Sequence, residues 1–128
     1  MRAIFIAFAA LLLLHTLSAN AAELIDQYVA VLSARDHFNS KGKRLTSAAA
    51  IIRQDRANYH KFGLRDQGDA GDSFFADADN RATLEKMLER GTSTKSAINS
   101  VVNGTPVILV QIFRSESGLP FINVSVMN

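Results

Sequence analysis

The residues best suited to chemistry lie in a basic stretch, SKGKRLTSAAA, at positions 40–50. Its glycine, cations and hydroxyl groups suit the binding of a phosphate. A Walker A loop is excluded, because that motif needs a hydroxyl residue after Gly42-Lys43, where Arg44 stands. Its first glycine would also have to occupy the position of His37. The stretch is therefore not a nucleotide-binding loop.

A less specific anion site remains open at the same place. Lys41, Lys43 and Arg44 precede a helix that is expected to begin at Thr46 or Ser47. Cations at this end oppose the helix dipole by about 0.3–1 kcal/mol each. An anion bound to the hydroxyl groups and the free amides would relieve that conflict.

The expected helix continues the basic surface. Arg53, Arg56 and His60 are spaced by three and four residues, so we expect their side chains on one helix face. Such a face suits phosphate, sulfate, uronate or an acidic protein. The candidate anion- or partner-binding residues are Lys41, Lys43, Arg44, Thr46, Arg53, Arg56 and His60.

The alternative is that these cations form a solvated surface or pair with nearby acids. Residues 35–65 hold eight cations and two aspartates, whereas residues 66–79 hold five aspartates and no cation. Each block could attract a partner of opposite charge, or the other block. The aspartates do not fit an EF-hand loop that starts at Asp69 or at Asp77. No metal site and no cofactor are indicated, and the absence of a recognised motif argues against sequence-specific nucleic-acid binding.

Catalysis is the competing hypothesis. After residue 21 the chain has two histidines, His37 and His60, which Asp36, Asp55 or a serine could join in a hydrolase or metal-dependent site. No G-x-S-x-G or H-E-x-x-H motif supports this. If the two imidazoles meet a carboxylate in a cleft, the enzyme is favoured; if they point apart, it is not.

Residues 1–21 have the features of a cleaved secretory signal peptide. Met1-Arg2 is a short positive region, residues 3–14 are apolar, and Ala19-Asn20-Ala21 places small residues at the cleavage positions. Twelve apolar residues are too few to span a bilayer, which takes about 20. We expect a periplasmic or secreted protein that is not an integral membrane protein once processed.

Removal of 21 of the 128 residues leaves residues 22–128, which we expect to form a single domain of 107 residues. A chain of this size can bury about two-thirds of its unfolded surface. It contains no cysteine, so packing must hold it together without disulfides, and thiol chemistry is excluded.

Hydrophobic periodicity predicts the elements that carry the basic residues. Helices are expected at residues 23–38, 46–62, 79–90 and 93–103, a loop at 64–76, and a β-hairpin formed by residues 107–114 and 121–127. The predicted fold is α+β, with about four helices packed on a small antiparallel sheet built around the C-terminal β-hairpin. Two strands are marginal, so we expect either a third strand from residues 64–76 or a homodimer through the hairpin.

These observations favour a small exported, non-catalytic binding or interaction protein. Its expected partner is an anionic envelope component or an acidic protein, met through the loop at 40–46 and the helix that follows. The alternatives are a small periplasmic hydrolase or metal-dependent enzyme that uses His37 and His60, and a structural envelope protein whose hairpin edge is its interface.

Overall fold

The computed structural model describes residues 22–128; the expected signal peptide lies outside the described residues. The described chain builds one antiparallel sheet of three strands in the order β1-β2-β3. The strands are β1 (Glu23–Val31), β2 (Val107–Arg114) and β3 (Pro120–Val126). Together with four α-helices they form an α+β fold around the predicted C-terminal hairpin, which confirms the fold class.

The predicted helix over residues 23–38 is wrong. The segment forms β1 and a short 3₁₀ helix, η1 (Ala34–His37). Its apolar residues fit a helical period, but burial alternates along the strand: Tyr28 and Ala30 are buried, whereas Val29 between them is partly exposed. Pairing with β2 places the first two against the core. The tertiary partner therefore overrides the local helical pattern.

The third strand is β1, so the alternative in which residues 64–76 supply it is also wrong. That loop instead covers the outer edge of β1. Ala70 N donates to Val29 O over 2.9 Å, and Val31 N donates to Asp69 Oδ1 over 2.8 Å. The loop thus satisfies backbone groups that an unprotected edge strand would present to another chain.

The other three predicted helices agree more closely with the structure. The observed helices are α1 (Ala48–His60), α2 (Ala78–Ala82), α3 (Leu84–Arg90) and α4 (Lys95–Asn103). Ser47 caps α1 by accepting from Ala50 N. Gly63 follows α1 with φ +66, a left-handed conformation that favours glycine. The helix predicted at 79–90 is split at Thr83, whose N–H and hydroxyl group both donate to Asn80 O and close a tight turn.

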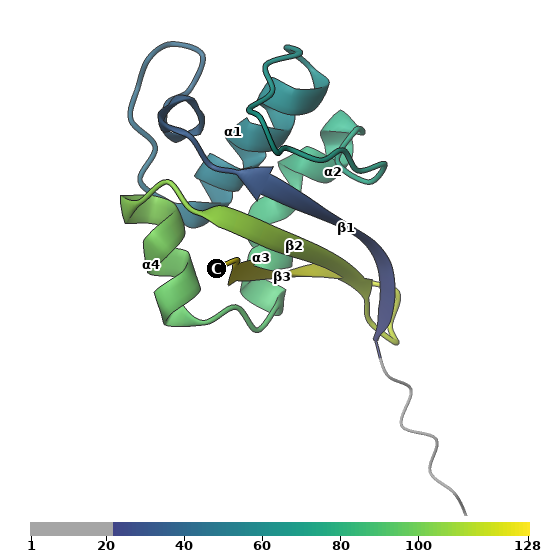
Figure 1. Cartoon of the computed structure of the whole chain (residues 1–128). Coiled ribbons are helices and arrows are strands. Elements are labelled where there is room, and N and C mark those ends of the chain that lie inside the picture. Colours follow the sequence, from purple (N-terminus) through teal and green to yellow (C-terminus); the bar gives the residue numbers. More distant parts are fainter. Residues whose placement is uncertain (1–21) are drawn as a thin grey trace, which may run out of the picture.

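All four helices lie on one face of the sheet, and the core forms between the two layers (Figure 1). The strands contribute alternate residues to it, among them Ile108, Val110 and Ile112 of β2, and the helices contribute residues such as Ile52 and Met87. The opposite face of the sheet carries no helix (Figure 1). No helix within residues 22–128 is long and apolar enough to cross a membrane.

The outer edge of β3 is covered over most of its length by residues 90–94. Arg90 donates to Pro120 O through Nε and Nη2, and Ser93 Oγ accepts from Val124 N. Between them the backbone of Gly91 passes against Ile122 O so closely that a Cβ would collide with it. Another strand could therefore pair along this part of β3 only by displacing residues 90–94.

Candidate functional site

A basic hollow lies between α1, α2 and the loop before α1. Its volume is about 490 Å³, and it is lined by Arg53 of α1, by Lys61 at the C-cap of α1 and by Arg81 of α2. Arg53 and Lys61 are exposed, whereas Arg81 is only 8% exposed. We call this hollow the basic cleft.

The two helices position these cations by different means. Ala50, Arg53, Gln54, Ala57 and Lys61 are spaced by three or four residues, which places them on one face of α1. Arg81 is held from the other side, because its Nη1 donates to the carbonyl oxygens of Phe75 and Ala76 over 2.8 and 3.1 Å.

A second, more apolar hollow adjoins the basic cleft. Its volume is about 420 Å³, and Phe38, Phe62 and Leu64 supply its apolar wall. The two hollows share Ser40, Gln54 and Phe62, so they meet at these three side chains. Ser40 and Gln54 provide a hydroxyl and an amide group where the hollows meet.

None of the described residues that line either hollow is acidic. The cations of the basic cleft therefore concentrate positive potential in a concave, partly desolvated space. An anion placed there would gain charge-assisted hydrogen bonds from Arg53, Lys61 and Arg81 and would reduce their mutual repulsion.

The predicted loop residues lie outside this cleft. Lys41 and Lys43 are exposed at a turn organised by Asn39, whose side chain accepts from both of their backbone N–H groups. Arg44 Nη2 donates to Val102 O over 2.8 Å. Thr46 is exposed and is not the helix cap, which is Ser47.

Arg56 is not on an exposed face, so that part of the sequence interpretation is wrong. It is fully buried: Nε donates to Asp55 Oδ2 over 2.8 Å, and Nη1 donates to Asp72 Oδ1 over 3.0 Å. Its guanidinium carbon lies 3.9 Å from the centre of the Tyr28 ring and 4.7 Å from that of Tyr59. The reason is tertiary: the acidic loop at 66–76 folds over α1 and pairs with it.

The histidines have separate partners. His60 Nε2 lies 2.8 Å from Asp72 Oδ1, so His60 belongs to the Arg56 cluster. His37 is buried, and its two ring nitrogens lie 2.8 Å from Ser33 O and 2.9 Å from Val101 O. These contacts tie η1 to α4.

Burial also changes the pKa values of two acids, Asp55 and Asp36. Desolvation raises the pKa of Asp55 to about 7, although the Arg56 guanidinium acts in the opposite direction. Burial likewise raises the pKa of Asp36, whose Oδ1 accepts from Asn58 Nδ2 over 2.9 Å. These groups form a structural network between α1, η1 and the acidic loop.

Of the seven predicted site residues, the basic cleft contains only Arg53. Lys61 could have been found from the sequence, because residues 53, 57 and 61 share a helix face. Arg81 could not, because its approach to α1 depends on the packing of α2. Among the described residues, no group of three or more histidine or acidic side chains could hold a metal ion.

A third hollow, of about 570 Å³, lies between α4 and β3. Hydroxyl and amide side chains dominate it, including Ser96, Ser100 and Asn123, and none of its described lining residues is charged. It therefore lacks the charge that would select an anion.

Fold and site together define a small α+β domain with a basic, acid-free cleft beside an apolar hollow. Comparison of the chain with protein-family models, with curated proteins and with solved structures found no match. A functional assignment therefore rests on the chemistry of the cleft.

Proposed function

We propose that the chain is a small exported, non-catalytic binding protein that holds an anionic ligand in the basic cleft. The observation that carries the proposal is the convergence of Arg53, Lys61 and Arg81 on one hollow whose described lining residues include no acid. The proposal keeps α1 as the binding helix. It replaces Arg56 and His60 with Lys61 and Arg81.

The adjoining hollow narrows the class of ligand. Phe38, Phe62 and Leu64 are each more than 40% exposed, so an apolar group placed there would be removed from water together with them. The expected ligand carries an anionic group for the cations and an apolar group for this wall, as a medium-chain carboxylate does. Lys41 and Lys43 remain candidates for attracting an anionic envelope component or an acidic protein.

Charge reversal tests the cleft. The double variant Arg53→Glu, Lys61→Glu should bind octanoate at least about tenfold more weakly, because two attractive charges become repulsive. Its free energy of unfolding should fall by less than about 2 kcal/mol, since both side chains are exposed and only Lys61→Glu, at the C-cap of α1, opposes the helix dipole. Isothermal titration calorimetry and urea unfolding measure the two quantities.

The matched control is Lys86→Glu, Lys95→Glu, which changes the net charge equally but alters exposed cations outside both hollows. It should bind octanoate like the unmodified chain. Equal weakening in both variants would mean that net charge, and not the cleft, attracts the ligand. A neutral analogue, 1-octanol, should bind more weakly than octanoate to the unmodified chain.

The enzyme hypothesis stays a prediction without a specific observation in its favour. It required His37 and His60 to meet a carboxylate in one cleft. In the described chain His37 contacts two backbone carbonyl groups, and His60 contacts Asp72.

Export is the second part of the proposal. The order of the positive, apolar and small-residue regions in residues 1–21 supports cleavage after Ala21. N-terminal sequencing of protein recovered from the periplasm or the medium should begin at Ala22. Protein that stays in the cytoplasm with Met1 intact would contradict the localisation.

A further inference from the structure

One face of the sheet carries no helix in the described chain (Figure 1). Each strand directs alternate residues to the helices, so the residues between them form the opposite face, which we call the open face. Its four cross-strand rows follow the strand register. It consists of Leu24, Gln27, Val29, Val31, Val107, Leu109, Gln111, Phe113, Phe121, Asn123, Ser125 and Met127.

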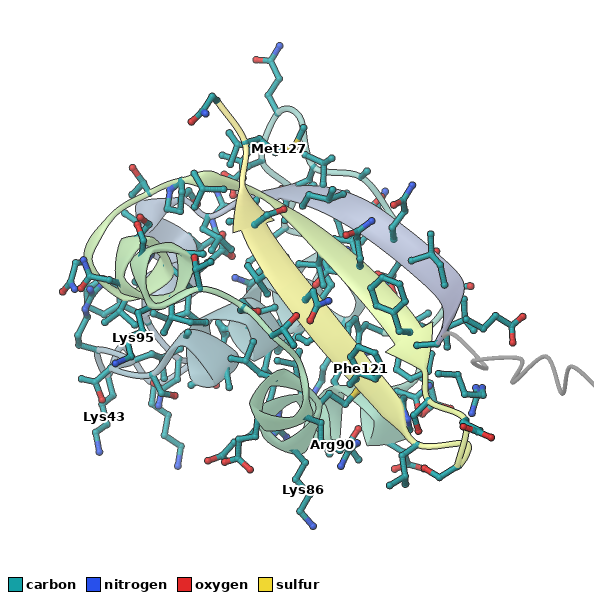
Figure 2. All side chains as sticks on the ribbon, turned by 90° about the horizontal axis from the view of Figure 1, so that it is seen from below. Lys43, Lys86, Arg90, Lys95, Phe121 and Met127 are labelled. Atoms are coloured by element: carbon teal, nitrogen blue, oxygen red, sulfur yellow. The ribbon has the colours of Figure 1, made fainter. Side chains whose placement is uncertain are left out.

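The open face is largely apolar. Leu24, Val107 and Met127 are 45%, 37% and 46% exposed, and the Phe113 and Phe121 rings stack with their centres 5.3 Å apart. Figure 2 shows Phe121 on β3 and Met127 just beyond its end, whereas Lys43, Lys86 and Lys95 project from the helical side. An exposed, largely apolar surface of this kind marks an interaction site.

The two edges of the sheet are not free to pair with another chain. The loop at 66–75 satisfies backbone groups of β1, and residues 90–94 satisfy those of β3. Addition of another strand at either edge would break these bonds. Association through the sheet is therefore expected at its open face.

The chemistry of the open face points to a second copy of the chain. It carries no charged side chain, so two copies meet without like-charge repulsion. The second of its four rows consists of amides, Gln27, Gln111 and Asn123. Within the described chain Gln111 Nε2 donates to Gln27 Oε1 over 3.3 Å, and Asn123 Oδ1 accepts from Thr92. Gln111 Oε1, Gln27 Nε2 and Asn123 Nδ2 are left as one acceptor and two donors, so the row can still pair with its own copy. In a lipid bilayer the remaining acceptor of Gln111 and the remaining donors of Gln27 and Asn123 would lose water without gaining a partner.

We propose that the chain forms a face-to-face homodimer through the open face, with the two-fold axis along the amide row at Gln111. Rotation about this axis places the residues on one side of the amide row opposite those on its other side in the second copy. The large row of Leu24, Phe113 and Phe121 then packs on the smaller row of Val29, Leu109 and Ser125 of the other copy. Such an isologous contact closes on itself, and the row of Val31, Val107 and Met127 lies at its periphery.

The size of the face sets the expected affinity. Three strands about 4.8 Å apart and about eight residues long give a face of about 14 by 26 Å. Side chains enlarge the contact, but it stays at or below the roughly 800 Å² per partner of a standard interface. The dimer is therefore expected to be weak, with a dissociation constant in the micromolar range.

Charge pairing at Gln111 tests the proposal. Sedimentation of the purified chain should show a monomer–dimer equilibrium between roughly 1 µM and roughly 1 mM. Gln111→Glu and Gln111→Arg should each be monomeric, because like charges then face each other at the axis. A mixture of the two should recover the dimer, since opposite charges then meet. Lys86→Glu, an exposed change on the helical side, should dimerise normally.

The outcomes separate a second copy from other occupants. Recovery in the mixture requires that position 111 of one copy lies near position 111 of the other. A chain that stays monomeric throughout overturns the proposal, whether or not it then binds neutral phosphatidylcholine vesicles or an apolar peptide. A dimer that both Gln111 variants leave intact overturns it as well. Circular dichroism confirms that each variant is folded.

Discussion

Arg56→Met should lower the free energy of unfolding by about 3–5 kcal/mol, the largest loss we expect from a single change in this chain. The substitution keeps much of the side-chain volume but removes the positive charge. Asp55 and Asp72 then remain in the interior without the cation that now donates to both of them. The carbonyl oxygen of Ala70 also loses its donor.

The aromatic contacts add to this loss. The Arg56 guanidinium lies over Tyr28 and Tyr59, and a desolvated cation–π contact is worth about 2 kcal/mol. Tyr28 belongs to β1, Tyr59 to α1 and Asp72 to the acidic loop. Arg56 therefore joins three segments that are far apart in the sequence.

Urea unfolding of matched variants measures the effect. Arg53→Met lies one helical turn earlier on α1 at an exposed position, and it should change stability by less than about 0.5 kcal/mol. Similar losses in the two variants would mean that Arg56 is solvated and that the acidic loop does not fold over α1.

Asp55→Asn should make the stability of the chain less dependent on pH. Desolvation by burial raises the pKa of Asp55 to about 7 in the folded state, against about 3.9 in an unfolded chain. Between these values the folded state binds the proton more strongly. Stability from this group is therefore present at the acidic end of the window and is lost as pH rises through 7.

The expected loss from Asp55 between pH 4 and pH 8 is on the order of 2–4 kcal/mol. Asp36, whose pKa burial also raises, acts in the same direction, so the difference between the unmodified chain and Asp55→Asn isolates Asp55. The control is Glu89→Gln, which removes an exposed carboxylate. If Asp55→Asn and the unmodified chain keep parallel pH profiles in thermal unfolding, Asp55 is ionised in the folded state throughout.

The elements predicted well from the sequence are those whose signals are local. Ser47 and Gly63 bracket α1, Thr94 caps α4, and the turn after Arg114 separates two β-rich runs. The segment at 23–38 was predicted incorrectly, because its apolar residues fit two periods. Only its pairing with β2, more than 75 residues away, decides between helix and strand.

The candidate site also contains residues that local sequence signals identify and residues that only tertiary packing places. Arg53 was identified because helical spacing is a local property, and Lys61 follows from the same spacing. The burial of Arg56 and the placement of Arg81 depend on how residues 66–82 fold over α1. A charged side chain that pairs in the interior looks identical in sequence to one that faces water. The opposed charge blocks were nevertheless a useful signal, since Asp72 of the acidic block binds Arg56 and His60 of the basic block.

The central claim is that the basic cleft holds an anion, and an NMR titration of the isotope-labelled chain with octanoate tests it most directly. Saturable shifts should appear at Ser40, Arg53, Lys61, Phe62 and Arg81, which line the hollow from three segments. They should weaken at high salt, because screening reduces the attraction. The absence of saturable shifts, or shifts confined to the open face, would contradict the claim.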